Sequence, residues 1–350
     1  MPNRTYISTA ARPVRRALRR WRRRLDPKIV VLLYHRVADV PSDPWDLCVT
    51  PRHFDEHLSV LKQHVDVIPI SEMQGALESG SFASRMAAIT FDDGYADNLY
   101  AAQPILERHD LPATFFLTSG LLGSEHEFWW DELERILVQC ACLPATLDLT
   151  LGAERRTWKL NGESEWNAAA GKWHREWRAS NPPETPRQRL YLAVWKILHP
   201  LPPAERQAAM TSLADWAGLT RWPRASHRIL NPDEAGVLAS RRRVEIGAHS
   251  VHHAALSAQP LSAQSDEIRS SKSSIEAMLD RRVNYFAYPY GDFSGETTTL
   301  VREAGFSAAF SAREGTAGPR GSRWEWPRRK VCDWSGAEFS RKLSAMLEQD

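Results

Sequence analysis

The stretch Met86-Ala-Ala-Ile-Thr-Phe-Asp-Asp-Gly-Tyr95 joins an apolar run to two adjacent acids and a glycine. A short, continuously apolar run predicts a strand buried on both faces, as in a parallel sheet. Asp92 and Asp93 would stand at its carboxyl end, where two like charges disfavour each other's ionisation unless a cation or a shared proton offsets them. One acid could then hold a metal ion while the other handles a proton. A surface turn is the alternative, because Asp-Gly is a frequent turn pair.

Similar apolar runs alternate with helical patterns along much of the chain. Strands are predicted at 28–35, 65–70, 86–91, 113–118, 244–250, 285–290, 306–312 and, more weakly, 329–332. Helices are predicted near 52–64, 97–109, 260–280, 294–304 and 335–349. This alternation is typical of an α/β fold with a parallel sheet, either a barrel or a doubly wound sheet. In both folds the chemistry lies at the carboxyl ends of the strands.

The middle of the chain, 126–235, has a different pattern. It shows helical periodicity broken by prolines, no comparable strands, and nine of the fourteen tryptophans. We interpret it as a mostly helical, Trp-rich insertion between the two parts of the barrel, 28–125 and 236–350. Most of its tryptophans are expected in a core, while one or two could stack on a sugar.

A second motif, Val244-Glu-Ile-Gly-Ala-His-Ser-Val-His-His253, ends another apolar run with metal-ligand residue types. His249 and His253 are four residues apart, so on a helical turn they would face the same side, and His252 could substitute by spacing. Two histidines and one carboxylate leave positions for water and substrate on a metal ion. A purely structural histidine pair is the alternative.

A third run, Tyr285-Phe-Ala-Tyr-Pro-Tyr-Gly291, ends in a turn. Pro289 has no amide hydrogen, whereas the amide of Tyr290 could point into the cleft as an oxyanion donor. An ordinary turn is the alternative.

Thr90-Phe-Asp-Asp-Gly-Tyr95, His249-Ser-Val-His-His253 and Tyr288-Pro-Tyr-Gly291, in that order, resemble the polysaccharide deacetylase family, the nodulation-protein-B-like, metal-dependent carbohydrate esterases. The opening Leu32-Leu-Tyr-His-Arg-Val37 is similar to the start of exopolysaccharide and capsule members. The resemblance implies a distorted (β/α)7 barrel and hydrolytic removal of acetyl groups from N-acetylated amino sugars of a polysaccharide or its precursor.

The same resemblance implies roles for individual residues. Asp92 would be the general base, Tyr290 the oxyanion donor through its backbone amide, Ser250 a support for the histidine loop, and Pro289 a neighbour of the donor. One divalent metal ion is expected, zinc first, with cobalt, nickel or manganese as alternatives. Its implied ligands are Asp93, His249 and His253.

Two departures from the family pattern affect these expectations. Many relatives have an arginine two residues before the proline of the third motif, where this chain has Ala287, and many take a catalytic acid histidine from near the C-terminus. The last histidine here is His253, so His35, after the first strand, is our candidate for the acid, with a buried, hydrogen-bonded histidine as the alternative. The residues expected to contact sugar are Tyr95, Trp130 and Trp324. Trp324, Trp326, Arg328 and Arg329, just before the last strand, could flank the cleft, but ordinary packing and solvated charge are the preferred expectation.

Composition excludes some other classes. The chain has 350 residues, 43% apolar and 25% charged, with four cysteines, which is ordinary for a soluble globular protein and too few cysteines for a disulfide scaffold. Nine arginines lie within 1–24 and the net charge is +2, so the remainder is mildly acidic and no nucleic-acid partner is expected. Residues 1–27 predict a basic arm or an amphipathic helix whose segment 12–25 contacts an anionic membrane. We expect a cytoplasmic protein, either free or peripheral at the inner membrane face.

The sequence thus favours a deacetylase acting on an acetylated glycan. The alternatives are a catalytically weakened barrel that binds glycan and an O-acetyl carbohydrate esterase that uses the same site.

Overall fold

The computed structural model describes residues 28–80, 85–151, 154–160, 176–219 and 224–348. The strands are β1 (Ile29–Tyr34), β2 (Arg36–Val37), β3 (Cys48–Val49), β4 (Asp66–Val67), β5 (Met86–Phe91), β6 (Ala113–Leu117), β7 (Thr146–Leu151), β8 (Glu154–Lys159), β9 (Val244–Ala248), β10 (Tyr285–Ala287), β11 (Ala308–Phe310) and β12 (Arg329–Lys330). The α-helices are α2 (Pro51–His64), α3 (Ile70–Ser79), α4 (Gln103–His109), α5 (Trp129–Glu134), α7 (Pro186–Leu198), α8 (Pro203–Trp216), α9 (Pro232–Ser240), α10 (Leu261–Leu279), α11 (Gly295–Glu303) and α12 (Gly336–Glu348). Shorter helical turns are η1 (Asn98–Ala102), η2 (Ser119–Leu121), η3 (Arg135–Gln139), η4 (Ala225–His227), η5 (Leu256–Ala258) and η6 (Pro289–Gly291).

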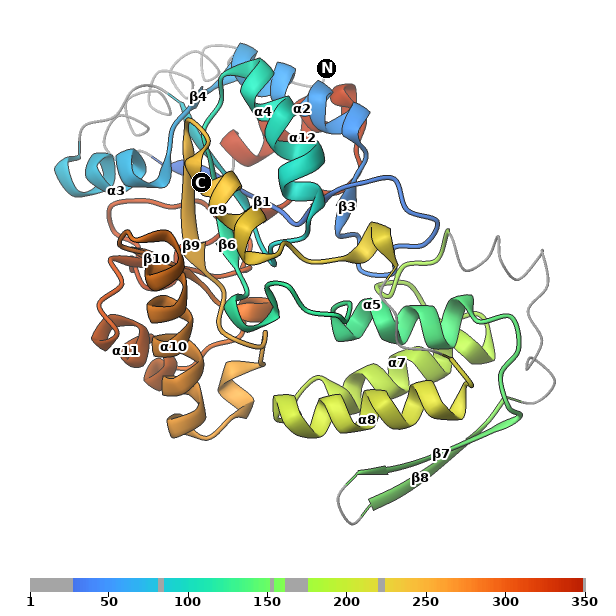
Figure 1. Cartoon of the computed structure of the whole chain (residues 1–350). Helices are drawn as coiled ribbons and strands as arrows, with labels where there is room; N and C mark the ends of the chain where they lie inside the picture. The colour runs from blue at the N-terminus through green and yellow to red at the C-terminus, as the bar shows by residue number, and fades with distance from the viewer. Residues whose placement is uncertain (1–27, 81–84, 152–153, 161–175, 220–223, 349–350) are drawn as a thin grey trace, which may run out of the picture.

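The main sheet is parallel and follows the order β11-β10-β9-β6-β5-β1-β12, with β4 paired to the beginning of β5. β1 and β5 pair along their whole length, from Ile29 opposite Met86 to Tyr34 opposite Phe91. A parallel bridge between Phe310 and Trp326, just before β12, links the two edges of the curved sheet. The predicted distorted (β/α) barrel is therefore confirmed, and its strand ends converge on one face (Figure 1).

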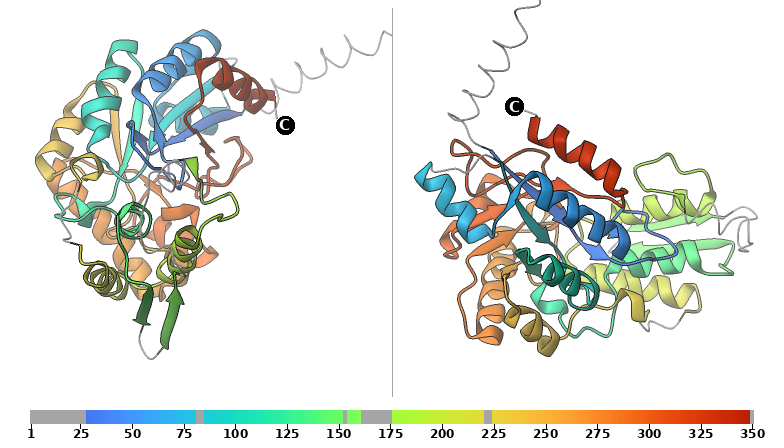
Figure 2. Two further views of the ribbon diagram at one scale, coloured as in Figure 1. Left: turned by 90° about the vertical axis from the view of Figure 1, so that its right-hand side faces the viewer. Right: turned by 90° about the horizontal axis from the view of Figure 1, so that it is seen from above.

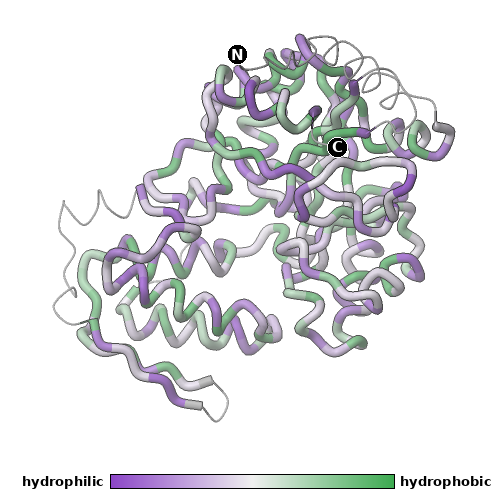
Figure 3. Tube along the Cα trace, turned by 180° about the vertical axis from the view of Figure 1, so that it is seen from behind, coloured by the Kyte–Doolittle hydropathy of each residue, from purple (hydrophilic) through white to green (hydrophobic). Residues whose placement is uncertain are grey.

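Alternate residues of the strands face two different cores. Val30 and Leu32 of β1 belong to the core beneath α2, α4, α10 and α12, whereas Ile29 and Val31 belong to the barrel interior, where α3 also contributes apolar side chains. Because both faces are covered, the strands are continuous apolar runs, as the sequence indicated. The helices change between hydrophobic and hydrophilic residues along their length, as expected for elements with one solvent-facing side (Figure 3).

The elements between Trp129 and Trp216 form a second core of their own beside the barrel. α5, α7, α8 and the β7–β8 hairpin gather on one side of the molecule, and the hairpin projects from it (Figures 1 and 2). This arrangement agrees with the predicted, mostly helical insertion. Its boundaries, 126 and 235, stay predictions. The expectation of no strands there was wrong, because β7 and β8 pair antiparallel over six residues each.

Two other elements differ from the sequence analysis. The run 65–70 forms only the two-residue β4, and its last residue, Ile70, begins α3, which we did not predict. The proposed membrane-contacting segment 12–25 lies outside the described residues, so the membrane contact and the cytoplasmic location stay predictions. Within the described part of the chain, no helix combines the length and the apolar character needed to cross a membrane.

Candidate active site

The first motif turns sharply at the carboxyl end of β5. The backbone N–H of Asp92 donates to the Tyr34 carbonyl at 3.0 Å, and the chain then enters positive φ at Asp93 (77°) and Gly94 (88°). A Cβ at Gly94 would lie 3.1 Å from Leu117 Cδ2, so glycine avoids both backbone strain and a tight contact. Both acids are buried, with exposed fractions of 3% and 1%. They are therefore not part of a surface turn.

The second motif follows β9 as an irregular loop, not as the helical turn that we predicted. The His249 N–H donates to the Leu117 carbonyl at 2.9 Å, and Ser250 (φ 62°) and His253 (φ 52°) then adopt left-handed conformations. Ser250 Oγ accepts a hydrogen bond from the His253 N–H at 3.0 Å. This local turn brings the two imidazole rings together, with 4.8 Å between their centroids.

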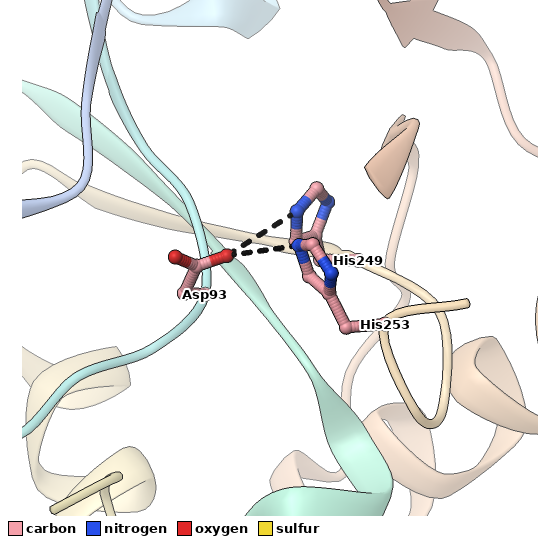
Figure 4. Close-up of side chains that lie close together, drawn as sticks. All are labelled: Asp93, His249 and His253. Carbon is pink, nitrogen blue, oxygen red and sulfur yellow. Dashed lines mark ion pairs between the residues drawn. The ribbon is translucent and has the colours of Figure 1, made fainter. Parts of the chain in front are cut away.

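Asp93, His249 and His253 are the only group of at least three His, Cys, Asp or Glu side chains, among the described residues, that could hold one metal ion (Figure 4). Asp93 Oδ1 lies 3.2 Å from His253 Nε2 and 3.5 Å from His249 Nε2. All three residues are buried, and Asp93 Oδ1 has no hydrogen-bond partner of good geometry. His252, the alternative by spacing, instead pairs with Glu267 of α10 at 2.7 Å.

The donor set fits a divalent cation. His249 Nδ1 lies 2.8 Å from the Ala287 carbonyl, which can only accept, so Nδ1 carries a proton and Nε2 is the ring atom directed toward Asp93. Burial lowers the pKa of His249, but the charge of Asp92 and the contact with Asp93 outweigh burial and raise the pKa, so a cation bound at Nε2 would take the place of a proton. Burial lowers the pKa of His253 to about 4, although Asp93 opposes the shift, so the His253 ring is neutral near pH 7. Two imidazoles and a carboxylate suit zinc and similar ions.

Asp92 is held by an arginine from the far end of the chain. Arg328 Nη1 and Nη2 donate to Asp92 Oδ1 and Oδ2, each at 2.6 Å, while Arg328 Nε donates to the Ser311 carbonyl at 2.9 Å. Burial alone would raise the pKa of Asp92, but the charge of Arg328, followed by that of His249, holds the pKa below its usual range. Asp92 is therefore a carboxylate, charged and fixed in orientation.

Asp92 thus has an arginine partner, although the third motif has Ala287 where many relatives have an arginine. Our expectation of ordinary packing and solvated charge was wrong for Arg328, whose side chain is completely buried. Its neighbour Arg329 pairs with the exposed Glu314 at 2.9 Å. The pairing of Asp92 with Arg328 could not be predicted, because the two residues are 236 positions apart and no recognisable motif surrounds the arginine.

The third motif forms the turn η6 after β10. Pro289 is buried, Tyr290 has a φ of 59°, and Gly291 has a φ of 68° with its position for a Cβ only 2.7 Å from Ala312 atoms. The Tyr290 ring packs against His253, with 4.4 Å between centroids. Positive φ at non-glycine residues is costly and concentrates at functional sites. Of the eight such residues described, four lie in the three motifs: Asp93, Ser250, His253 and Tyr290.

His35 follows β1 directly and lies beside the acidic pair. Its side chain is partly exposed, and within the described residues its ring makes no hydrogen bond. Burial lowers its pKa, while the charges of Asp93 and Asp92 oppose the shift. This environment does not support the alternative of a buried, hydrogen-bonded structural histidine.

Two of the three predicted sugar contacts, Tyr95 and Trp130, are buried. Tyr95 is fully buried and its hydroxyl donates to Asp131 at 2.6 Å. Trp130 is 4% exposed, donates to the Tyr95 hydroxyl at 3.0 Å, and packs on His253. Trp324 packs against the helix-covered core on the outer side of the sheet. Tyr95 and Trp130 therefore pack behind the site and are not available to sugar, whereas the sugar contact of Trp324 stays a prediction.

Asp131 gives a prediction for stability. Burial raises its pKa to about 7, against the opposing charge of Arg36 and the hydrogen bond from Tyr95. The folded state thus holds a proton that the unfolded chain releases near pH 4, and stability falls as the pH rises from about 4 to about 7. Asp131→Asn still accepts from Tyr95 but cannot ionise.

We compare the free energy of unfolding of Asp131→Asn with that of the wild type at pH 4 and at pH 8. The difference, variant minus wild type, should be about 1–3 kcal/mol larger at pH 8, allowing for partial exposure of the carboxyl. Urea titrations at the two pH values measure this difference. A difference that is equal at both would show that Asp131 titrates normally.

The fold and the site together define a class of protein: a (β/α) barrel enzyme with two histidines, a carboxylate and an arginine-held acid at its strand ends. The family model described as polysaccharide deacetylase matches residues 79–139 and 208–309. These two ranges contain all three motifs. Over these two ranges the chain is similar to the polysaccharide deacetylase family, as its motifs indicated.

Solved structures agree with this fold. The deacetylase PplD of Streptococcus pyogenes, solved in complex with acetate, is 16% identical, with a TM-score of 0.57, over 93% of this chain and 100% of that one. IcaB of Ammonifex degensii is also 16% identical, with a TM-score of 0.56, over 92% of this chain and 97% of that one. At such low identity these likenesses establish the fold alone.

Among curated proteins, the chain is similar to YxkH of Bacillus subtilis (strain 168), which is named as a polysaccharide deacetylase. The two are 25% identical over 111 residues, which cover 31% of this chain. The match spans only 38% of the length of that relative.

Proposed function

We propose that the protein is a metal-dependent deacetylase that removes acetyl groups from N-acetylated amino sugars of a polysaccharide or its precursor. The observation that carries this proposal is the buried group of Asp93, His249 and His253 beside the arginine-held Asp92. The match to the polysaccharide deacetylase family supports an acetylated glycan as the substrate.

Each residue has one task in the proposed reaction. A divalent cation held by Asp93, His249 and His253 would supply a Lewis acid for the acetyl carbonyl and lower the pKa of a water molecule. Asp92 accepts the proton of the attacking water as its oxygen bonds to the carbonyl carbon. The backbone N–H of Tyr290 donates to the carbonyl oxygen as that oxygen becomes negative.

The leaving amine needs a proton as the carbon–nitrogen bond breaks, and we assign its delivery to His35. Its position beside Asp92 and Asp93 and its partly exposed, unbonded ring support this role. The products are acetate and a free amino group. The proton that Asp92 has gained then returns through solvent to His35, which has given its own proton to the amine, and this restores both groups.

An acetate-release assay on N-acetylglucosamine oligomers tests the function. We expect release by the purified chain, a fall of about 100-fold or more after chelation, and recovery with zinc, compared with cobalt, nickel and manganese. Elemental analysis should find one ion per chain in the wild type and none in Asp93→Ala. Full activity in metal-stripped protein would refute the metal-dependent reaction.

The same groups could cleave an ester, so O-acetylated sugars belong in the same assay. The alternative of a weakened glycan-binding barrel was motivated partly by Ala287, and the position of Arg328 removes that motive. The other motive, that no histidine follows His253 in this sequence, is unchanged. Glycan binding without acetate release, over all substrates and metals, would favour that alternative.

A further inference from the structure

Tyr290 has a backbone conformation that the third motif alone does not explain. Its φ and ψ are 59° and 4°, a left-handed conformation that non-glycine residues rarely adopt. Such a conformation persists only where the surroundings hold it firmly. The next residue, Gly291, also has positive φ, so the local chain offers little stiffness of its own.

The insertion supplies that firm hold through the Tyr290 side chain. Trp129 Nε1, at the start of α5, donates to the Tyr290 hydroxyl at 2.9 Å. The ring of His199, directly after α7, lies 4.4 Å from the Tyr290 ring between centroids, at a steep angle. Trp130 and Trp195 pack around the same ring at 6.1 and 6.5 Å. Tyr290 thus extends from the barrel into an aromatic cage built by the insertion.

Trp129 is itself fixed in place. It is 7% exposed, and the Arg206 guanidinium of α8 lies over its indole at 5.4 Å. Arg206 Nη2 also donates to the His252 carbonyl at 2.9 Å. The insertion therefore contacts the third motif through Trp129 and the histidine loop through Arg206. Because Arg206 packs on the Trp129 indole, the two contacts are adjacent.

We propose that Trp129 is a positioning residue: its hydrogen bond to the Tyr290 hydroxyl holds the left-handed backbone that directs the Tyr290 amide to the reacting carbonyl. This inference rests on the proposed function, in which that amide stabilises the oxyanion. It also gives the insertion a role in the reaction. An oxyanion donor is effective only when it is held in place before the charge develops.

Trp129→Phe removes the indole N–H and keeps an aromatic ring, and Tyr290→Phe removes its acceptor. We expect each variant to lower kcat about 10-fold while KM changes less than about 2-fold, because a displaced donor weakens binding of the transition state and not of the substrate. The double variant should lose no more than either single one. N-acetylglucosamine oligomers and 4-nitrophenyl acetate should be slowed by similar factors, because both pass through a tetrahedral oxyanion. His35→Gln should slow mainly the oligomer, whose amine leaving group needs a proton.

Trp216→Phe is the matched control. Trp216 lies in the same insertion, at the end of α8, and its Nε1 donates to a backbone carbonyl, that of Thr146, at 2.8 Å. We expect this variant to lose stability without losing kcat. A second measurement needs no activity: hydrogen exchange of the backbone amides in 285–293 should accelerate in Trp129→Phe and not in Trp216→Phe.

Equal kcat in Trp129→Phe and Trp216→Phe, or unchanged exchange of 285–293 in Trp129→Phe, would overturn the inference while the wild type still releases acetate. A wild type that releases no acetate with any metal would instead overturn the proposed function. In that case accelerated exchange in Trp129→Phe would still support Trp129 as the residue that holds the Tyr290 backbone, and unchanged exchange would refute it.

Discussion

Asp92→Asn is expected to lower kcat for acetate release by roughly 10³-fold, because the amide cannot accept the proton of the attacking water. The side chain keeps nearly the same size and can still accept one hydrogen bond from Arg328, so the shape of the site is preserved. The wild-type carboxylate is 3% exposed and its pKa is held below its usual range against burial, chiefly by Arg328. It is therefore ionised at neutral pH.

The measurement is steady-state acetate release at saturating N-acetylglucosamine oligomer, with the metal content of each variant determined in parallel. Asp92 is not among the proposed ligands, so Asp92→Asn should bind about as much metal as the wild type. A suitable control is Glu245→Gln, which removes an acid of β9 whose carboxylate accepts from the Ile70 N–H and the Thr114 hydroxyl, each at 2.9 Å. Its kcat should change less than about 2-fold. An Asp92→Asn enzyme as fast as this control would refute Asp92 as the base.

The parts of the site that follow strands were predictable, because local sequence determines where a buried strand ends. The apolar runs ending at Phe91 and Ala248 and the polar residues after them were visible without a structure. The carboxyl ends of parallel strands meet at one face, so bringing Asp93 and His249 together needed no knowledge of side-chain packing. The hairpin was missed although Leu147 and Leu149 alternate with polar residues, a strand pattern hidden among helical segments.

Contacts between distant segments could not be predicted in this way. The helical-turn interpretation of His249 and His253 used spacing alone, whereas the loop depends on left-handed φ at Ser250, which spacing does not reveal. Trp129 meets Tyr290 because the insertion folds back on the barrel, and a Trp-rich segment shows only that a core exists. Arg328 lies in a charged stretch that is typical of a surface, and only the closing of the sheet near Trp326 turns it inward.

Arg328→Met is expected to lower the free energy of unfolding by about 3–5 kcal/mol, because it leaves the Asp92 carboxylate buried without its partner. Activity should fall as well, by roughly 100-fold, since an unfixed Asp92 no longer meets the water in one orientation. Arg328→Lys should be intermediate, because an ammonium group keeps the charge but cannot make two parallel hydrogen bonds. Urea unfolding and acetate release measure the two effects separately.

The double variant Asp92→Asn/Arg328→Met distinguishes a buried ion pair from general packing. With both charges gone, most of the lost stability should return, while activity stays as low as in Asp92→Asn. Arg329→Met is the control in the same segment: its partner Glu314 is largely exposed, so we expect a cost of no more than about 1–2 kcal/mol. If Arg328→Met unfolds no more easily than Arg329→Met, the Asp92–Arg328 pair does not hold the catalytic acid, and the function of the missing motif arginine must be sought elsewhere in the chain.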